Sequence, residues 1–114
     1  MSRRNELNIL INNKRYALNE MYTNCNYLSD FRNEIVAEFF VNNPQEAVTL
    51  QDELQLGKII LIKLENNDFC YDVEDAIVYS YRAENQFNSV KFKVNFLYKG
   101  LTLSKRNRLG FFNE

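Results

Sequence analysis

The residues best suited to chemistry are four carboxylates in one short stretch, Asp68, Asp72, Glu74 and Asp75. Asp72 and Glu74 are two positions apart, so on a β-strand they would project from one face about 6.5–7 Å apart. Such a pair has the oxygen ligands that Mg²⁺ and Ca²⁺ prefer, and it also has the groups for acid–base catalysis. One pair on an otherwise ordinary strand is weak support for a site, however, and we favour a structural or surface role.

The residue types that are scarce exclude most other chemistry. The 114 residues include no histidine, which removes the commonest general base and the commonest metal ligand. The three glycines are not clustered, so they form no phosphate-binding loop or dinucleotide fingerprint. Cys25 and Cys70 form no CxxC motif; one disulfide is possible, but two reduced thiols in a cytosolic protein is the simpler interpretation. We therefore predict that the protein is not an enzyme and uses no cofactor or metal.

Charge is balanced overall but divided along the chain. The 14 Lys and Arg residues against 15 Asp and Glu residues give a net charge of −1, which argues against specific nucleic-acid binding. Residues 34–84 carry eleven acids and three bases, whereas residues 88–108 carry six bases and no acid. Either these charges pair within one molecule, or they form a bipolar surface through which copies meet head to tail. The longest aliphatic run, Ile59–Ile62, is too short to cross a membrane, so no membrane partner is expected.

The hydrophobic pattern predicts mostly β-strands. Apolar residues alternate with polar ones over residues 90–98, and residues 34–41 form a second strong strand that we expect to be covered on both faces. Asn12-Asn13 predicts a tight turn, because asparagine tolerates a positive φ. An unbroken strand over residues 69–82 would turn Asp75 toward the apolar face, so a bulge or corner is expected there.

One helix is predicted near the middle of the chain. Asn43 suits the N-cap and Pro44 the first turn, although Thr49 with Asp52 offers a second, later start. Gly57 is a natural stop. The apolar stripe of this helix consists of Ala47, Leu50 and Leu54.

These elements, with a strand over residues 58–64, predict one mainly β domain that spans residues 1–114. We expect an antiparallel β-barrel or sandwich of about six to eight strands with one short α-helix. Residues 1–5 would form an N-terminal arm, and residues 102–114 a basic tail that contains phenylalanine.

Several aromatic and charged residues are candidates for a protein interface. Tyr22 and Tyr27 fall in the mostly polar stretch 19–33, a long loop or a strand extension, and tyrosine is enriched at interfaces. Phe111 and Phe112 follow a basic run and would dock on their own domain or on a neighbour. The full set of candidate interface residues is Tyr22, Tyr27, Asp72, Glu74, Asp75, Lys105, Arg106, Arg108, Phe111 and Phe112.

The order of these elements resembles the tail-tube fold. The stretch Val73-Glu74-Asp75-Ala76-Ile77-Val78-Tyr79-Ser80-Tyr81 is similar to a strand of bacterial secretion-tube proteins, in which an acidic pair and an alanine precede an apolar-serine-tyrosine run. The stretch Ser89-Val90-Lys91-Phe92-Lys93-Val94 looks like the closing strand of that family. The family includes phage tail-tube proteins, the haemolysin-coregulated tube protein of type VI secretion and tube-like domains of tail hubs.

The resemblance implies a structural protein of a phage tail or of a contractile injection or type VI secretion apparatus. Its copies would form a ring, commonly a hexamer, that stacks into a tube or adapts a tube to a baseplate. Its partners would be other copies and other proteins of the apparatus, and it would reside in the cytoplasm or in the assembled particle. The alternative is a small phage- or bacterium-encoded protein-binding module, an inhibitor or adaptor without catalytic activity.

Overall fold

A computed structural model of the chain describes residues 7–25 and 33–106, which form eight antiparallel strands and one helix. The prediction of a mainly β fold with six to eight strands and one short helix is confirmed. The elements in chain order are β1 (Asn8–Ile11), β2 (Lys14–Cys25), β3 (Asn33–Val41), α1 (Pro44–Glu53), β4 (Ile62–Glu65), β5 (Phe69–Glu74), β6 (Ile77–Gln86), β7 (Ser89–Tyr98) and β8 (Gly100–Arg106).

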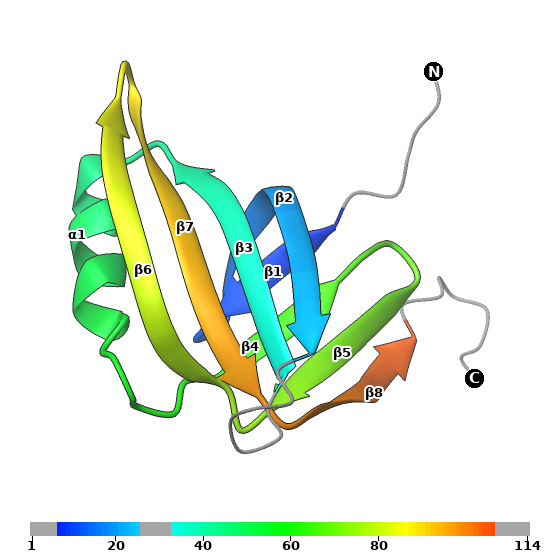
Figure 1. Cartoon of the computed structure of the whole chain (residues 1–114). Coiled ribbons are helices and arrows are strands. Elements are labelled where there is room, and N and C mark those ends of the chain that lie inside the picture. The colour runs from blue at the N-terminus through cyan, green and yellow to red at the C-terminus, as the bar shows by residue number, and fades with distance from the viewer. Residues whose placement is uncertain (1–6, 26–32, 107–114) are drawn as a thin grey trace.

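The strands form one sheet in the order β6-β7-β3-β2-β1-β4-β5-β8, which folds over on itself (Figure 1). The fold-over occurs along β2. The first residues of β2 pair with β1, whereas its residues from Leu18 onward pair with β3. A shift of register between Leu18 and Glu20 separates the two halves, as expected of a bulge, which bends a strand and increases its twist. β2 therefore belongs to both layers.

The core lies between the two layers and is built by alternating residues. Ile9, Ile11 and Ile62 fill it from the β1–β4 side, and residues of β3 and β7 fill it from the other. At its centre the ring of Phe39 stacks on Phe92, with ring centroids 5.7 Å apart, and on Tyr16 at 4.9 Å. The predicted alternation in β7 is confirmed by three side chains that are fully buried, Phe92, Val94 and Phe96.

Helix α1 packs on the layer formed by β3 and β7 and begins at the earlier of the two predicted starts. The Asn43 side-chain oxygen accepts hydrogen bonds from the backbone N–H groups of Gln45 at 2.8 Å and Glu46 at 3.3 Å. These bonds satisfy donors that have no partner inside the first turn of a helix. The predicted apolar stripe of Ala47, Leu50 and Leu54 is buried.

Replacing Asn43 with alanine is expected to lower the free energy of unfolding by about 1 kcal/mol, because both capping bonds are lost. Asn43→Ser is the matched control, since serine also accepts bonds from the first turn and should retain most of the stability. Urea denaturation followed by circular dichroism measures both changes. Equal stability of the alanine variant and the unmodified protein would contradict the capping role.

Both predicted turns are present, and one predicted strand begins later than expected. Asn12 and Asn13 have φ values of 52° and 72°, as a two-residue hairpin turn between β1 and β2 requires. The corner expected near Asp75 falls between β5 and β6, and Asp75 itself has a φ of 52°. The strand expected over residues 58–64 starts only at Ile62. Its first residues instead lie against the beginning of β6.

Candidate interaction surfaces

Three of the four carboxylates of the predicted acidic cluster lie on or just after β5 and have a partner in their own chain, whereas Asp68 lies in the turn before β5. Asp72 is 3.3 Å from the Lys63 ammonium, and Asp75 is 3.8 Å from that of Lys99. The Glu74 carboxylate accepts a hydrogen bond from the Thr102 hydroxyl. Within residues 7–25 and 33–106, no group of three or more His, Cys, Asp or Glu residues is placed to hold a metal ion. The contacts that these carboxylates make join β5 to β4, to β8 and to the chain just before β8.

The division of charge along the sequence is partly cancelled by pairing in the folded chain. Besides the two pairs at β5, Lys91 lies 3.9 Å from Glu84, and Arg15 forms a two-point contact with Glu65 at 2.9 and 3.2 Å. Exposed pairs of this kind contribute only about 0–1 kcal/mol each to stability. They therefore organise the surface more than they stabilise the fold.

Two neighbouring side chains of β2 have raised pKa values. The hydrogen bond from Arg15 to Glu65 raises the pKa of the guanidinium above its ordinary value. Burial, followed by the nearby carboxylates of Glu46 and Glu53, raises the pKa of the Tyr16 hydroxyl. Because both shifts move titration further from neutral pH, Arg15 stays charged and Tyr16 stays neutral at physiological pH. Neither group is poised for proton transfer.

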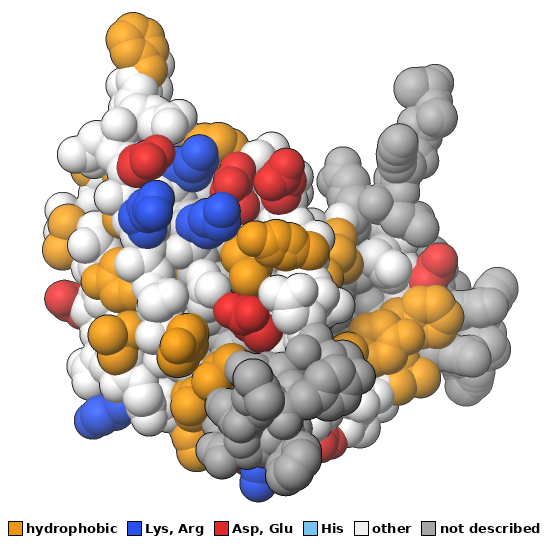
Figure 2. All heavy atoms as spheres, in the orientation of Figure 1, with side chains coloured by type: hydrophobic (Ala, Val, Ile, Leu, Met, Phe, Trp, Pro, Cys, Tyr) orange, Lys and Arg blue, Asp and Glu red, His pale blue; other side chains and the backbone are white. Residues whose placement is uncertain are grey.

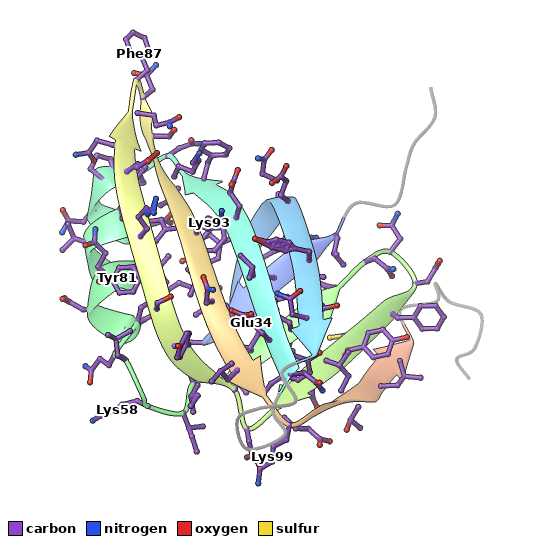
Figure 3. The ribbon with its side chains drawn as sticks, in the orientation of Figure 1. Glu34, Lys58, Tyr81, Phe87, Lys93 and Lys99 are labelled. Atoms are coloured by element: carbon purple, nitrogen blue, oxygen red, sulfur yellow. The ribbon has the colours of Figure 1, made fainter. Side chains whose placement is uncertain are left out.

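The surface of β2, β3, β7 and β6 that faces away from the core carries a row of four charges, which we call the charged row. In cross-strand register its members are Glu20, Glu38, Lys93 and Arg82, one from each strand. The two acids are thus direct neighbours, and so are the two bases. Figure 2 shows this face, where basic and acidic side chains gather beside exposed hydrophobic ones. Lys93 lies near the middle of the face (Figure 3).

The charged row is not neutralised by short contacts within the molecule. In the part of the chain that the structure describes, neither Lys93 nor Arg82 forms an ion pair within 4.0 Å. Glu38 accepts a hydrogen bond from the Asn19 side chain at 2.7 Å. Like charges directly opposite each other on a sheet are destabilising. The two outer neighbour pairs of the row are therefore unfavourable in an isolated molecule, whereas its middle pair, Glu38 opposite Lys93, is of opposite charge and favourable.

Aromatic side chains flank the charged row on both sides. Tyr22, a predicted interface residue, is 51% exposed and lies opposite Val36 in the next row. On the other side Phe40 is 40% exposed and lies opposite Lys91. The expectation that β3 is covered on both faces holds for Val36, which is buried, but not for Phe40. The outward side of β3 thus presents apolar surface to solvent.

Among the described residues, the sheet ends in β6 on one side and in β8 on the other. At one end the start of β6 is covered by the chain that follows α1, through the bonds from Gly57 N–H to Val78 O at 2.8 Å and from Ile60 N–H to Ala76 O at 2.9 Å. Beyond these bonds, β6 pairs only with β7 among the described residues. At the other end β8 pairs, within the same described part, only with β5. The predicted interface residues Lys105 and Arg106 belong to β8, which also contains the first residues of the expected tail.

One exposed aromatic residue was not predicted as an interface residue. Phe87 lies at the tip of the β6–β7 hairpin, which projects beyond the helix and the other strands, and it is 90% exposed (Figures 1 and 3). The signal available in the sequence is a single phenylalanine between the polar residues of Gln86-Phe87-Asn88, in a turn between two strands.

The charged row was also not predicted from the sequence, because it depends on strand register. Four predicted interface residues, Tyr27, Arg108, Phe111 and Phe112, lie outside the described residues.

Helix α1 is the only helix in the described residues, and it is too short and too polar to cross a membrane. The chain was also compared with models of known protein families and with curated protein sequences. It matches none of them.

Proposed function

We propose that the protein is a structural, non-catalytic assembly protein whose copies associate edge to edge into a ring. Such a ring would form part of, or an adaptor for, the tube of a phage tail or of a contractile injection or type VI secretion apparatus, as the resemblance to tail-tube proteins implies. The observation that carries the proposal is that the sheet, in the part of the chain that the structure describes, ends in two different strands, β6 and β8.

An open edge is a row of backbone N–H and C=O groups that another strand can pair with. Soluble proteins commonly protect such edges with proline or lysine; the one proline of this chain is Pro44, in α1, and the lysine of β8, Lys105, lies near the end of the strand. The two edges are different strands of the same sheet, so β6 of one copy can pair with β8 of the next. Contacts of this head-to-tail type close into a ring when the rotation between neighbours is suitable.

Apolar side chains at both edges favour the same association. Leu101 and Leu103 of β8 are 47% and 48% exposed, and Tyr79 of β6 is 59% exposed. Edge pairing would remove part of this surface from water, at about 25 cal/mol per Å² of apolar area. The proposed contact thus combines backbone hydrogen bonds with hydrophobic burial.

Light scattering behind size-exclusion chromatography tests the proposal over a range of protein concentrations. We expect a species whose mass is a fixed multiple of 13.6 kDa and which appears as a ring by electron microscopy. A chain that stays monomeric at every concentration would contradict ring assembly.

A second function, a small inhibitor or adaptor that binds another protein, is favoured by one observation. Phe87 at the tip of a projecting hairpin has the form of an aromatic anchor for a pocket on a partner, and such anchors dominate many interfaces. Under this alternative the chain is monomeric until it meets its partner.

A further inference from the structure

We infer that the charged row is a two-fold contact with a second copy of this chain. This inference rests on the self-association proposed above, but it assigns a second contact that is separate from the sheet edges. The order of charges across the four strands is acid, acid, base, base, from Glu20 and Glu38 to Lys93 and Arg82. With adjacent strands about 4.8 Å apart, the row is about 14 Å long.

The order of charges makes the row complementary to the same row on a second copy. When a second copy faces the first across a two-fold axis parallel to the strands, the row of that copy runs in the opposite direction. Its two bases then lie over Glu20 and Glu38, and its two acids lie over Lys93 and Arg82. A two-fold contact uses the same patch on both copies, so the patch must be complementary to itself. The charged row meets this condition.

The surroundings of the row support the same contact. The side chains of Lys93 and Arg82 have no ion pair with other described residues, although the chain forms such pairs elsewhere. A second copy would relieve the repulsion between the neighbouring like charges and would fix the register of the contact. Tyr22 and Phe40, on either side of the row, would supply apolar area to be buried.

The two contacts together define the form of the assembly. Edge pairing from β6 to β8 is head to tail and builds a ring, whereas the charged row joins two copies about a two-fold axis. With its two-fold axis perpendicular to the ring axis, the charged-row contact joins two rings face to face, which is a dihedral assembly. Removing the charged-row contact should therefore halve the mass and leave single rings.

Charge reversal tests the inference in three variants. Lys93→Glu with Arg82→Glu makes the row entirely acidic, and Glu20→Lys with Glu38→Lys makes it entirely basic. We expect each of these to have half the mass of the unmodified assembly by light scattering, and a 1:1 mixture of the two to regain the full mass. The third variant carries all four changes, which restores a self-complementary row, and should have the full mass on its own.

The matched control is Lys14→Glu with Lys58→Glu, which changes the net charge as much as the acidic-row variant does. Both lysines are exposed and lie outside the row, so this variant should keep the full mass. A salt concentration of 1 M, where the Debye length is about 3 Å, should halve the mass of the unmodified protein.

The outcomes separate this inference from the proposed function. Rings whose mass none of the reversals changes would overturn the charged-row contact and leave edge assembly standing. A dimer that the acidic-row and basic-row variants convert to monomers would support the row and contradict the ring. A monomer at every concentration would overturn both.

Discussion

Replacing Phe39 with alanine is expected to lower the free energy of unfolding by about 3–5 kcal/mol, the usual range for a buried phenylalanine. Phe39 is fully buried and stacks on both Tyr16 and Phe92. The truncation removes both ring contacts and leaves a cavity between the layers, where β3 cannot move inward without breaking its pairing with β2 and β7. Because small domains are stable by only about 5–15 kcal/mol, the variant should be partly unfolded at moderate temperature.

Phe87→Ala is the matched control, since it removes the same side chain from a site that is 90% exposed. It should change the free energy of unfolding by no more than about 0.5 kcal/mol. Urea denaturation followed by circular dichroism gives both values. A loss below about 1 kcal/mol for Phe39→Ala would show that this stack is not the centre of the core.

Proline in place of Leu103 is expected to break the edge-to-edge contact and so abolish the ring. In an antiparallel sheet, successive residues turn their peptide groups to opposite sides. The Glu74 carbonyl faces β8, because it accepts a bond from the Lys99 N–H just before that strand. The register partner of Glu74 is Gly100, so the peptide groups of Gly100 and Thr102 face β5. The N–H of Leu103, one residue further on, therefore lies on the open edge. Proline removes that donor and places its ring where the strand of the next copy would lie, but an edge strand tolerates it.

Leu103→Val is the control for this experiment, because valine keeps the N–H group and favours strands. Light scattering at 1 M salt, where the charged-row contact is screened, should give one ring mass for the unmodified protein and the valine variant, and the 13.6 kDa monomer for the proline variant. Circular dichroism verifies that the proline variant is folded. A proline variant that is folded and still forms rings would exclude β8 as the contact.

The features that local sequence could predict are those set by neighbouring residues. The alternation in β7 identified its buried side chains, and Asn43 with Pro44 identified the start of α1. The Asn12-Asn13 turn and the corner at Asp75 followed from the same kind of local rule. Each of these depends on fewer than a dozen consecutive residues.

The features that were missed depend on residues far apart in the chain. Residues 58–61 have the composition of a strand, but bonds to residues 76 and 78 hold them against β6 instead. The charged row combines residues 20, 38, 82 and 93, and a slip of one residue in any strand would turn that member of the row to the core. Local pattern carries no information on such register, so the candidate surface could not be predicted from sequence.

The bend in β2 has a mechanical consequence. Because β2 hydrogen-bonds to β1 with its first residues and to β3 with the rest, the backbone bonding is continuous from β6 to β8. In a ring joined edge to edge, a pull along the strands would load many peptide hydrogen bonds at once, in shear. Within each copy there is no boundary between separate sheets at which the ring could open by breaking one hydrogen bond at a time. The load would instead be shared among all of the hydrogen bonds between the strands.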